Sequence, residues 1–184
     1  MPASVRAARP FPTWRTAALA LATLGARALL VRATLAKLRG DLDALNSGDY
    51  RPILANYAPD AVLHFNDGPH RWSGEHRGKA AVERFLRDFV AAGIRGRITE
   101  LVVGGPPWRM TLMMRYDDHA HDPSGREIYR NRTALVAHAR WGRIVEQWDF
   151  YEDSGRIEAL EASLRALGVA PAAAQPSPEP RAVA

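Results

Sequence analysis

The chain has 184 residues, of which 47% are hydrophobic and 24% charged, and its formal net charge is +5. This length suits one domain with tails, and the absence of cysteine excludes disulfides, thiolate metal sites and cysteine nucleophiles. The basic residues are nearly all arginines spread along the chain rather than gathered on one face, which argues against a nucleic-acid-binding protein.

The N-terminal part contains the most apolar stretch of the chain. Residues 17–31 are rich in alanine, but Arg27 interrupts them, and a membrane-spanning helix needs about 20 apolar residues. We predict an N-terminal arm or extra helix over residues 1–27, with membrane association or export through residues 17–31 left open as an alternative. The main domain is expected over residues 28–168 and a disordered tail over residues 169–184, in a cytoplasmic protein.

Three stretches of the chain have helical periodicity. Over residues 28–46, leucines recur at three- and four-residue steps, which predicts an amphipathic helix. Apolar residues follow one helical face in the same way over residues 78–93 and 154–167. A short helix is expected to follow Asp49 and to end at Pro59.

After the second long helix the hydrophobic period changes to two, which is typical of strands. Long strands are expected over residues 94–103, 108–116, 127–141 and 143–151, and short ones over residues 61–65 and 70–72. Helices followed by a run of strands indicate an α+β fold. A curled antiparallel or mixed sheet would wrap around the N-terminal helices as a cone and leave a concave space inside.

The last two predicted strands are joined by a Trp-Gly break and form a hairpin. Because side chains on a strand alternate between faces, Gln147, Asp149 and Tyr151 share one face of the last strand. A lone carboxylate on a face that must pack against the rest of the protein suits the wall of a cavity better than a solid core.

Four short segments resemble the SnoaL-like family of the nuclear transport factor 2-like superfamily. They are NSGDY at 46–50, YAPDAV at 57–62, RGKAAVERF at 77–85 and GRIVEQWD at 142–149. The superfamily includes ketosteroid isomerase, limonene epoxide hydrolase and scytalone dehydratase. The resemblance implies a cone-shaped α+β fold with a deep apolar pocket, a homodimer formed through the outer face of the sheet, and chemistry without a cofactor.

The catalytic pattern of ketosteroid isomerase is not reproduced at the corresponding positions. Phe65, with His64 beside it, stands where that family has its base, and Asp41 and Leu135 stand where it has its oxyanion donors. Steroid isomerisation is therefore not expected. The resemblance instead implies that Asp149 matches the last-strand carboxylate that serves as acid and base in SnoaL-like cyclases.

Three residues are candidate catalytic groups, each with a structural alternative. Asp149 is either a general acid–base in an apolar pocket or a buried carboxylate with structural partners. Asp41 shares a helix face with Leu38 and either points into the pocket or lies just off the buried stripe. His64 either forms a dyad with Asp67 at the pocket mouth or is simply solvated.

Further residues are candidates for ligand binding, with core packing as the alternative for the apolar ones. They are Tyr57, Phe65, Trp108, Met110, Met114, Asn131, Thr133, Gln147 and Tyr151. No metal is expected, because the histidines at 119 and 121 lie in a predicted loop where such residues are mostly solvated. No cofactor is expected either.

These observations support one functional hypothesis and one alternative. The hypothesis is a pocket protein for an apolar small molecule, whose enzymatic form is a cofactor-independent isomerase, cyclase or hydrolase that uses a pocket carboxylate. The alternative is a non-catalytic ligand-binding or dimerisation module with the same fold.

Overall fold

The structure is a computed structural model, and it describes residues 13–173, with side chains from residue 25. Predictions for residues 1–12 and 174–184, which belong to the expected arm and tail, lie outside the described residues. The chain divides into two units, residues 1–36 and residues 37–184. Helix α1 (Thr13–Asn46) begins in the first unit and ends in the second, so the predicted helix starts well before residue 28. No helix in the described part of the chain is long and apolar enough to cross a membrane.

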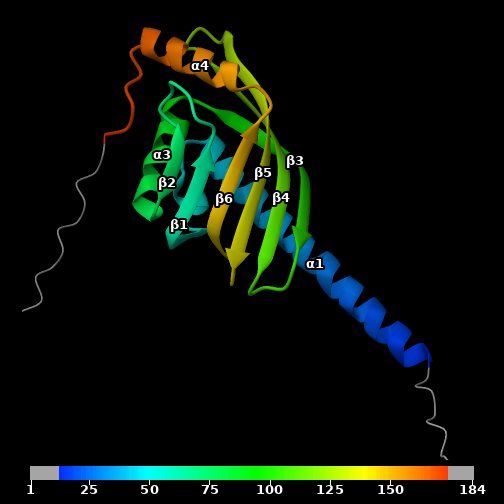
Figure 1. Cartoon of the computed structure of the whole chain (residues 1–184). Coiled ribbons are helices and arrows are strands. Elements are labelled where there is room, and N and C mark those ends of the chain that lie inside the picture. Colours follow the sequence, from blue (N-terminus) through cyan, green and yellow to red (C-terminus); the bar gives the residue numbers. More distant parts are fainter. Residues whose placement is uncertain (1–12, 174–184) are drawn as a thin grey trace, which may run out of the picture. The chain divides into compact units, whose positions relative to one another are not determined.

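The second unit holds the end of α1 and all the other elements (Figure 1). In chain order these are α2 (Arg51–Leu54), β1 (Tyr57–Phe65), β2 (Gly74–Arg77), α3 (Lys79–Ala91), β3 (Arg95–Gly104), β4 (Met110–His121), β5 (Glu127–Arg140), β6 (Arg143–Tyr151) and α4 (Ser154–Ala166).

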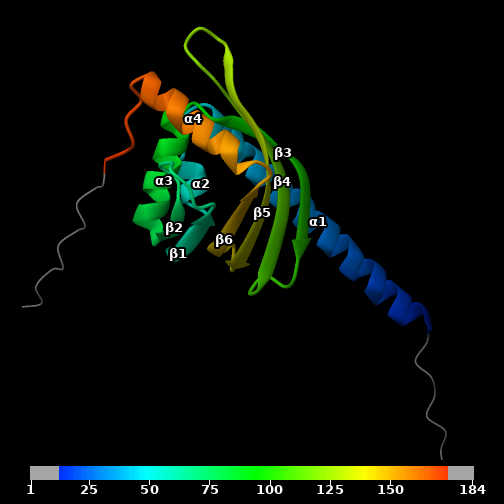
Figure 2. The ribbon, with the colours of Figure 1, turned by 45° about the horizontal axis from the view of Figure 1, so that its top comes forward.

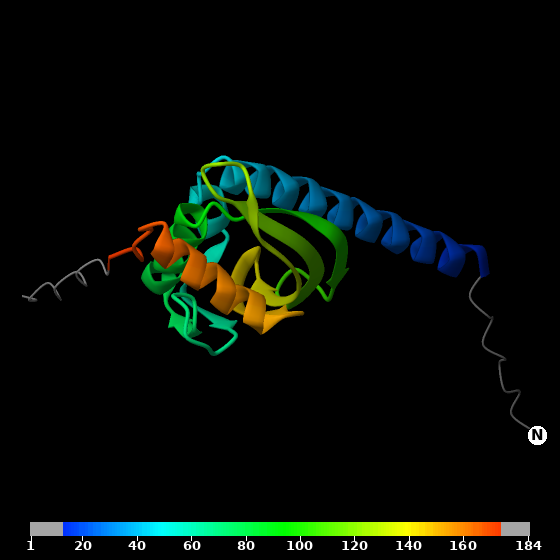
Figure 3. The ribbon, with the colours of Figure 1, turned by 90° about the horizontal axis from the view of Figure 1, so that it is seen from above.

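The strands form one six-stranded sheet in the order β2-β1-β6-β5-β4-β3. Every neighbouring pair is antiparallel except β1 and β6, which run parallel. The sheet curls, and α4 lies across one end of it (Figure 3). The predicted α+β fold with a curled, mixed sheet is therefore confirmed.

The core lies between the concave face of the sheet and the helices. Leu42 and Leu45 from the end of α1, Phe85 and Phe89 from α3, and Leu160 from α4 are all buried in one cluster with inward residues of the sheet. Burying apolar surface stabilises the fold by about 25 cal/mol per Å². This hydrophobic burial is the main force that holds the helices and the sheet together.

Three local predictions were wrong in their boundaries. The helix after Asp49 is only the single turn α2, because Tyr57 already pairs with Ile144 of β6 and is buried as a strand residue. The short strand expected over residues 70–72 lies four residues later, as β2 (Gly74–Arg77). Strand β4 continues past Tyr116 to His121, because its polar residues pair with β5 in a long hairpin (Figure 2).

A buried ion pair ties α4 and the segment after it to the rest of the unit. Arg71 Nε donates to Glu161 Oε2 at 2.7 Å, and the side chains of both residues are almost inaccessible to water. Arg71 also donates to the carbonyl oxygen of Val169 at 2.8 Å, while Asp88 accepts from the backbone of Ala172 at 2.6 Å. The chain after α4 is therefore held by charged partners inside the protein.

Replacing Arg71 with alanine should lower the free energy of unfolding by about 3 kcal/mol, because it leaves Glu161 as a buried charge with fewer partners. Arg165→Ala removes an exposed arginine from the same carboxylate and should cost less than about 1 kcal/mol. Urea denaturation of both variants measures the difference. Equal losses would contradict a special role for the buried pair.

Candidate functional site

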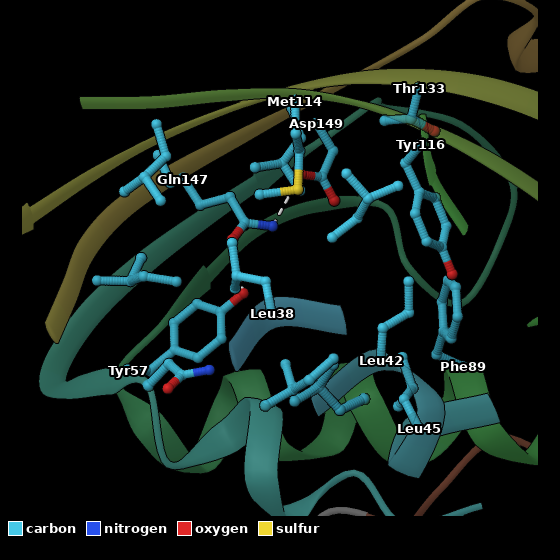
Figure 4. Close-up of a pocket in the computed structure, with 18 of the residues that line it drawn as sticks. Leu38, Leu42, Leu45, Tyr57, Phe89, Met114, Tyr116, Thr133, Gln147 and Asp149 are labelled. Carbon is cyan, nitrogen blue, oxygen red and sulfur yellow. Dashed lines mark hydrogen bonds between the residues drawn. The ribbon is translucent and has the colours of Figure 1, made fainter. Parts of the chain in front are cut away.

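A cavity of about 130 Å³ lies between the concave face of the sheet and the helices. Its helix side is apolar and includes Leu38, Leu42 and Phe89, whereas Gln147 and Asp149 lie on the sheet side (Figure 4). An apolar cavity of about 150 Å³ is large enough to hold benzene, so this space suits a small ring-sized ligand or part of a larger one.

The pairing of strands β4, β5 and β6 arranges the sheet side of the cavity in rows. Leu112, Ala137 and Gln147 face one another across the strands, and the next row is Met114, Leu135 and Asp149. The third row carries hydroxyl groups: Tyr116, Thr133 and Tyr151. All nine side chains line the cavity, because residues two apart on a strand share a face.

A chain of hydrogen bonds fixes the carboxyl group of Asp149 in the cavity wall. The hydroxyl of Tyr57 donates to Oε1 of Gln147 at 2.6 Å, and Nε2 of Gln147 donates to Oδ1 of Asp149 at 2.8 Å. All three residues are buried, with Asp149 9% exposed. Because Tyr57 occupies the amide oxygen, the amide NH₂ of Gln147 is left to face Asp149.

Burial changes the acidity of this carboxyl group. Removal from water raises the pKa of Asp149 to about 7, the hydrogen bond from Gln147 opposes that rise, and the charge of Asp118 adds to it. Burial, with the charge of Asp149, also raises the pKa of Tyr57, which therefore stays a hydroxyl donor. A carboxyl group that gains and loses its proton near neutral pH is suited to acid–base chemistry.

Six of the residues singled out in the sequence come together around this cavity. They are Tyr57, Met114, Thr133, Gln147, Asp149 and Tyr151. They come from β1, β4, β5 and β6, so the cavity wall depends on strands that are distant in sequence.

Asp41 lies behind the wall rather than in it. Its Oδ2 accepts from Lys37 Nζ at 2.5 Å and from Asn56 Nδ2 at 2.7 Å. Asn56 lines the cavity and Asp41 does not. The helix face that carries Leu38 and Leu42 does turn toward the cavity, but the Asp41 side chain is held by Lys37 one turn earlier.

His64 lies outside the cavity, beside Trp148. The neighbours of His64 in β1, Leu63 and Phe65, are buried in the core, so strand alternation directs His64 the other way. Its ring stacks on Trp148 with centroids 5.1 Å apart, and its Nε2 lies 3.2 Å from Glu146. Of the two alternatives, the dyad with Asp67 is not formed, and His64 instead contacts Glu146 and Glu75.

Four other candidates do not line the cavity. Phe65 packs against Phe85 in the core, and Met110 is buried at the start of β4. Asn131 donates to the carbonyl oxygen of Asp153 at 2.7 Å. Trp108 is largely exposed and contacts Trp141, which belongs to the turn between β5 and β6.

Asp118 is a buried carboxylate that the sequence reasoning did not single out as a site. It is 1% exposed, and its Oδ2 accepts from Tyr151 at 3.2 Å and from Tyr129 at 3.3 Å. Burial raises the pKa of Asp118 to about 7. The alternation that places Met114 and Tyr116 inward would have placed Asp118 inward too, had the strand been extended past residue 116.

The described residues contain no group of three or more histidine, aspartate or glutamate side chains placed to hold a metal ion. His119 and His121 contact each other with ring centroids 5.3 Å apart. They lie at the end of β4, where they line a groove rather than the cavity.

Comparison with known proteins identifies the family. The SnoaL-like domain matches residues 38–147, which is more than half of the chain. The chain therefore belongs to the SnoaL-like domain family, as the resemblance of its sequence motifs predicted. No curated protein matches the chain.

Solved structures agree with this fold. Bal32a, from a soil-derived mobile gene cassette, has a TM-score of 0.53 and 18% identity over 72% of this chain and 96% of its own. A nuclear transport factor 2-like protein from Burkholderia pseudomallei has a TM-score of 0.51 and 22% identity, covering 70% and 92%. A loop truncation variant of IdmH has a TM-score of 0.51 and 22% identity, covering 67% and 95%. At these identities the likeness concerns the fold alone.

The raised pKa of Asp149 predicts a pH-dependent stability. In the folded protein the pKa is about 7, above the value of about 3.9 in an unfolded chain, so the folded state holds the proton more tightly. This contribution is fully present below about pH 4 and is lost as the pH rises through about 7. Its loss amounts to at most about 4 kcal/mol, from about 1.4 kcal/mol per pH unit.

Asp149→Asn should therefore reduce the fall in the free energy of unfolding between pH 4 and 8, while Asp118 still contributes its part. Urea denaturation at several pH values measures it, with Asp43→Asn at an exposed helical carboxylate as the control that keeps the wild-type slope. A wild-type slope in the Asp149 variant would show that this residue is not the buried acid.

Proposed function

We propose that this protein binds a small apolar molecule carrying a carbonyl group, and that Asp149 moves a proton on it without a cofactor. The observation that carries the proposal is a carboxyl group with a raised pKa inside a mostly apolar cavity, held by one amide donor. Groups with pKa values near the working pH make the most efficient general acids and bases.

The residues around Asp149 have distinct roles in this proposal. Gln147 holds Oδ1, and Tyr57 holds Gln147, so the carboxyl group has one orientation. The other oxygen, Oδ2, is the atom we assign to proton transfer. Leu38, Leu42 and their apolar neighbours exclude water, which strengthens electrostatic interactions with a bound ligand.

The proposed step is proton removal next to a carbonyl group. Ionised Asp149 takes a proton from the carbon beside the carbonyl, the bonding electrons move to form an enolate, and the carboxylic acid returns the proton to carbon. If it returns to a different carbon, the result is an isomerisation. Because Asp41 and His64 lie outside the cavity wall, the proposal assigns both proton movements to Asp149.

Exchange of ketone hydrogens with solvent deuterium tests this proposal. We expect the wild-type protein to accelerate exchange of the α-hydrogens of 1-indanone, a ketone of suitable size, as followed by proton NMR. Asp149→Asn should slow the catalysed exchange by at least about 100-fold, the usual contribution of a positioned base. Asp117→Asn, at a carboxylate outside this cavity, is the control and should keep the wild-type rate.

The result is decisive because both variants replace a carboxylate with its amide. Equal exchange rates in wild type and Asp149→Asn would exclude proton transfer by Asp149. Binding of 1-indanone without any catalysed exchange would favour a non-catalytic binding module.

The outer face of the sheet favours a second role in dimerisation. An apolar row crosses four adjacent strands, because Val102 of β3 pairs with Met113 of β4, Met113 with Val136 of β5, and Val136 with Trp148 of β6. The row is exposed in β3 and β4 and half-buried in β5 and β6. Val102 and Met113 are 62% and 52% exposed. We propose that a second copy of this chain covers this row, since contiguous exposed apolar surface commonly marks an interface.

Met113→Glu should weaken the dimer at least about tenfold, because a charge would be buried against apolar neighbours. Sedimentation velocity over a range of protein concentrations measures the change. Leu167→Glu, at an exposed leucine just after α4, is the matched control and should leave the dimer unchanged. A wild-type protein that stays monomeric at high concentration would refute this role.

A further inference from the structure

Asp118 is a buried carboxyl group without a role in the proposed proton transfer. Its Oδ2 accepts hydrogen bonds from Tyr151 and Tyr129, while its Oδ1 has no hydrogen-bond partner among the described residues. Burying an ionised carboxylate is costly unless a cation pairs with it. No ion pair with Asp118 is found in the described part of the chain. Burial without a cation therefore favours the protonated form of this carboxyl group.

Asp118 also lines a groove that is separate from the cavity. This groove has a volume of about 660 Å³, and it is bordered by Gly96, Asn131 and a set of basic residues. Each of its four arginines is already paired with another carboxylate: Arg97 with Asp117, Arg130 with Glu127, Arg132 with Glu152 and Arg156 with Asp153. The groove therefore surrounds Asp118 with polar residues, but none of these arginines forms an ion pair with it.

Tyr151 lines the cavity and contacts Asp118, which lines the groove. It lines the cavity together with Asp149, and its hydroxyl donates to Asp118 at 3.2 Å. The row that contains Tyr151 lies between the row of Asp149 and the row of Asp118 on the inner face of the sheet. Tyr116, in the same row, has a buried hydroxyl group without a protein partner among the described residues.

We propose that Asp118 and Asp149 form one proton-coupled pair, with Tyr151 as the side chain that connects them. Asp118 is then a positioning residue: it fixes the Tyr151 hydroxyl and sets how readily Asp149 gains or loses its proton. This inference rests on the proposed function, because it concerns the same acid–base group.

The charges near Asp118 determine whether its ionisation raises or lowers the pKa of Asp149. Tyr116, Tyr129 and Tyr151 carry pKa values raised mainly by burial and remain neutral donors. Asp117 carries a negative charge that opposes ionisation of Asp118. The charge of Asp118 in turn opposes ionisation of Asp149. Ionising Asp118 therefore raises the pKa of Asp149, and removing that charge lowers it.

Carbon-13 NMR of the full chain, labelled at the aspartate carboxyl carbons, tests the pair without any ligand. In the wild-type protein, the signals of Asp118 and Asp149 should each respond to the titration of the other, as coupled sites do. In Asp118→Asn, the titration midpoint of Asp149 should fall by about half a pH unit, because a nearby negative charge is removed. Tyr151→Phe should change the midpoint of Asp118, because it removes a hydrogen-bond donor to that group.

Asp43→Asn is the control, since it removes an exposed helical carboxylate that lines neither the cavity nor the groove. It should leave the midpoint of Asp149 where it is. The wild-type titration keeps the test valid even if Asp118→Asn fails to fold.

The outcomes separate the two proposals. If Asp149 titrates near pH 7 but is indifferent to Asp118, the coupled pair is refuted and the proposed function stands. If Asp149 titrates near pH 4 in the wild-type protein, the proposed function fails, whatever the variants show.

Discussion

The functional arrangement depends on one constraint: the carboxyl group of Asp149 is buried among apolar side chains, and the amide of Gln147 donates a hydrogen bond to it. Asp149 cannot be ionised there as easily as in solution, and the hydrogen bonds from Tyr57 through Gln147 hold it in one orientation. The helices provide the apolar side of the cavity, and the sheet provides the polar side. Removing either layer would return Asp149 to water and give it ordinary acidity.

The curled sheet creates this environment because alternation and register act together. Alternation places Gln147, Asp149 and Tyr151 on one face of β6, and register aligns them with β5 and β4 in successive rows. The same geometry gives the outer face its apolar row, which is exposed at Val102 and Met113. One sheet therefore separates two kinds of surface, a cavity on the concave side and a face suited to protein contact on the other.

Much of this could be read from the sequence, because hydrophobic period is a local property. It located α3, the four long strands, α4 and the Trp-Gly hairpin, and the family motifs predicted the curled α+β fold. It also placed Asp149 beside Gln147 on an inward face. It failed at Asp118, because the polar residues after Tyr116 hide the alternation, and only pairing with β5 shows that the strand continues.

The sequence by itself determined which residues share a face of a helix or a strand, since that follows from the geometry of the single element. Only the tertiary structure decided which of those faces enclose the cavity. It set His64 outside and Asp41 behind Asn56, and it brought Tyr57 of β1 to Gln147 of β6. The reason is physical: the parallel pairing of β1 with β6 and the curl of the sheet are contacts between distant segments, and no local period encodes them.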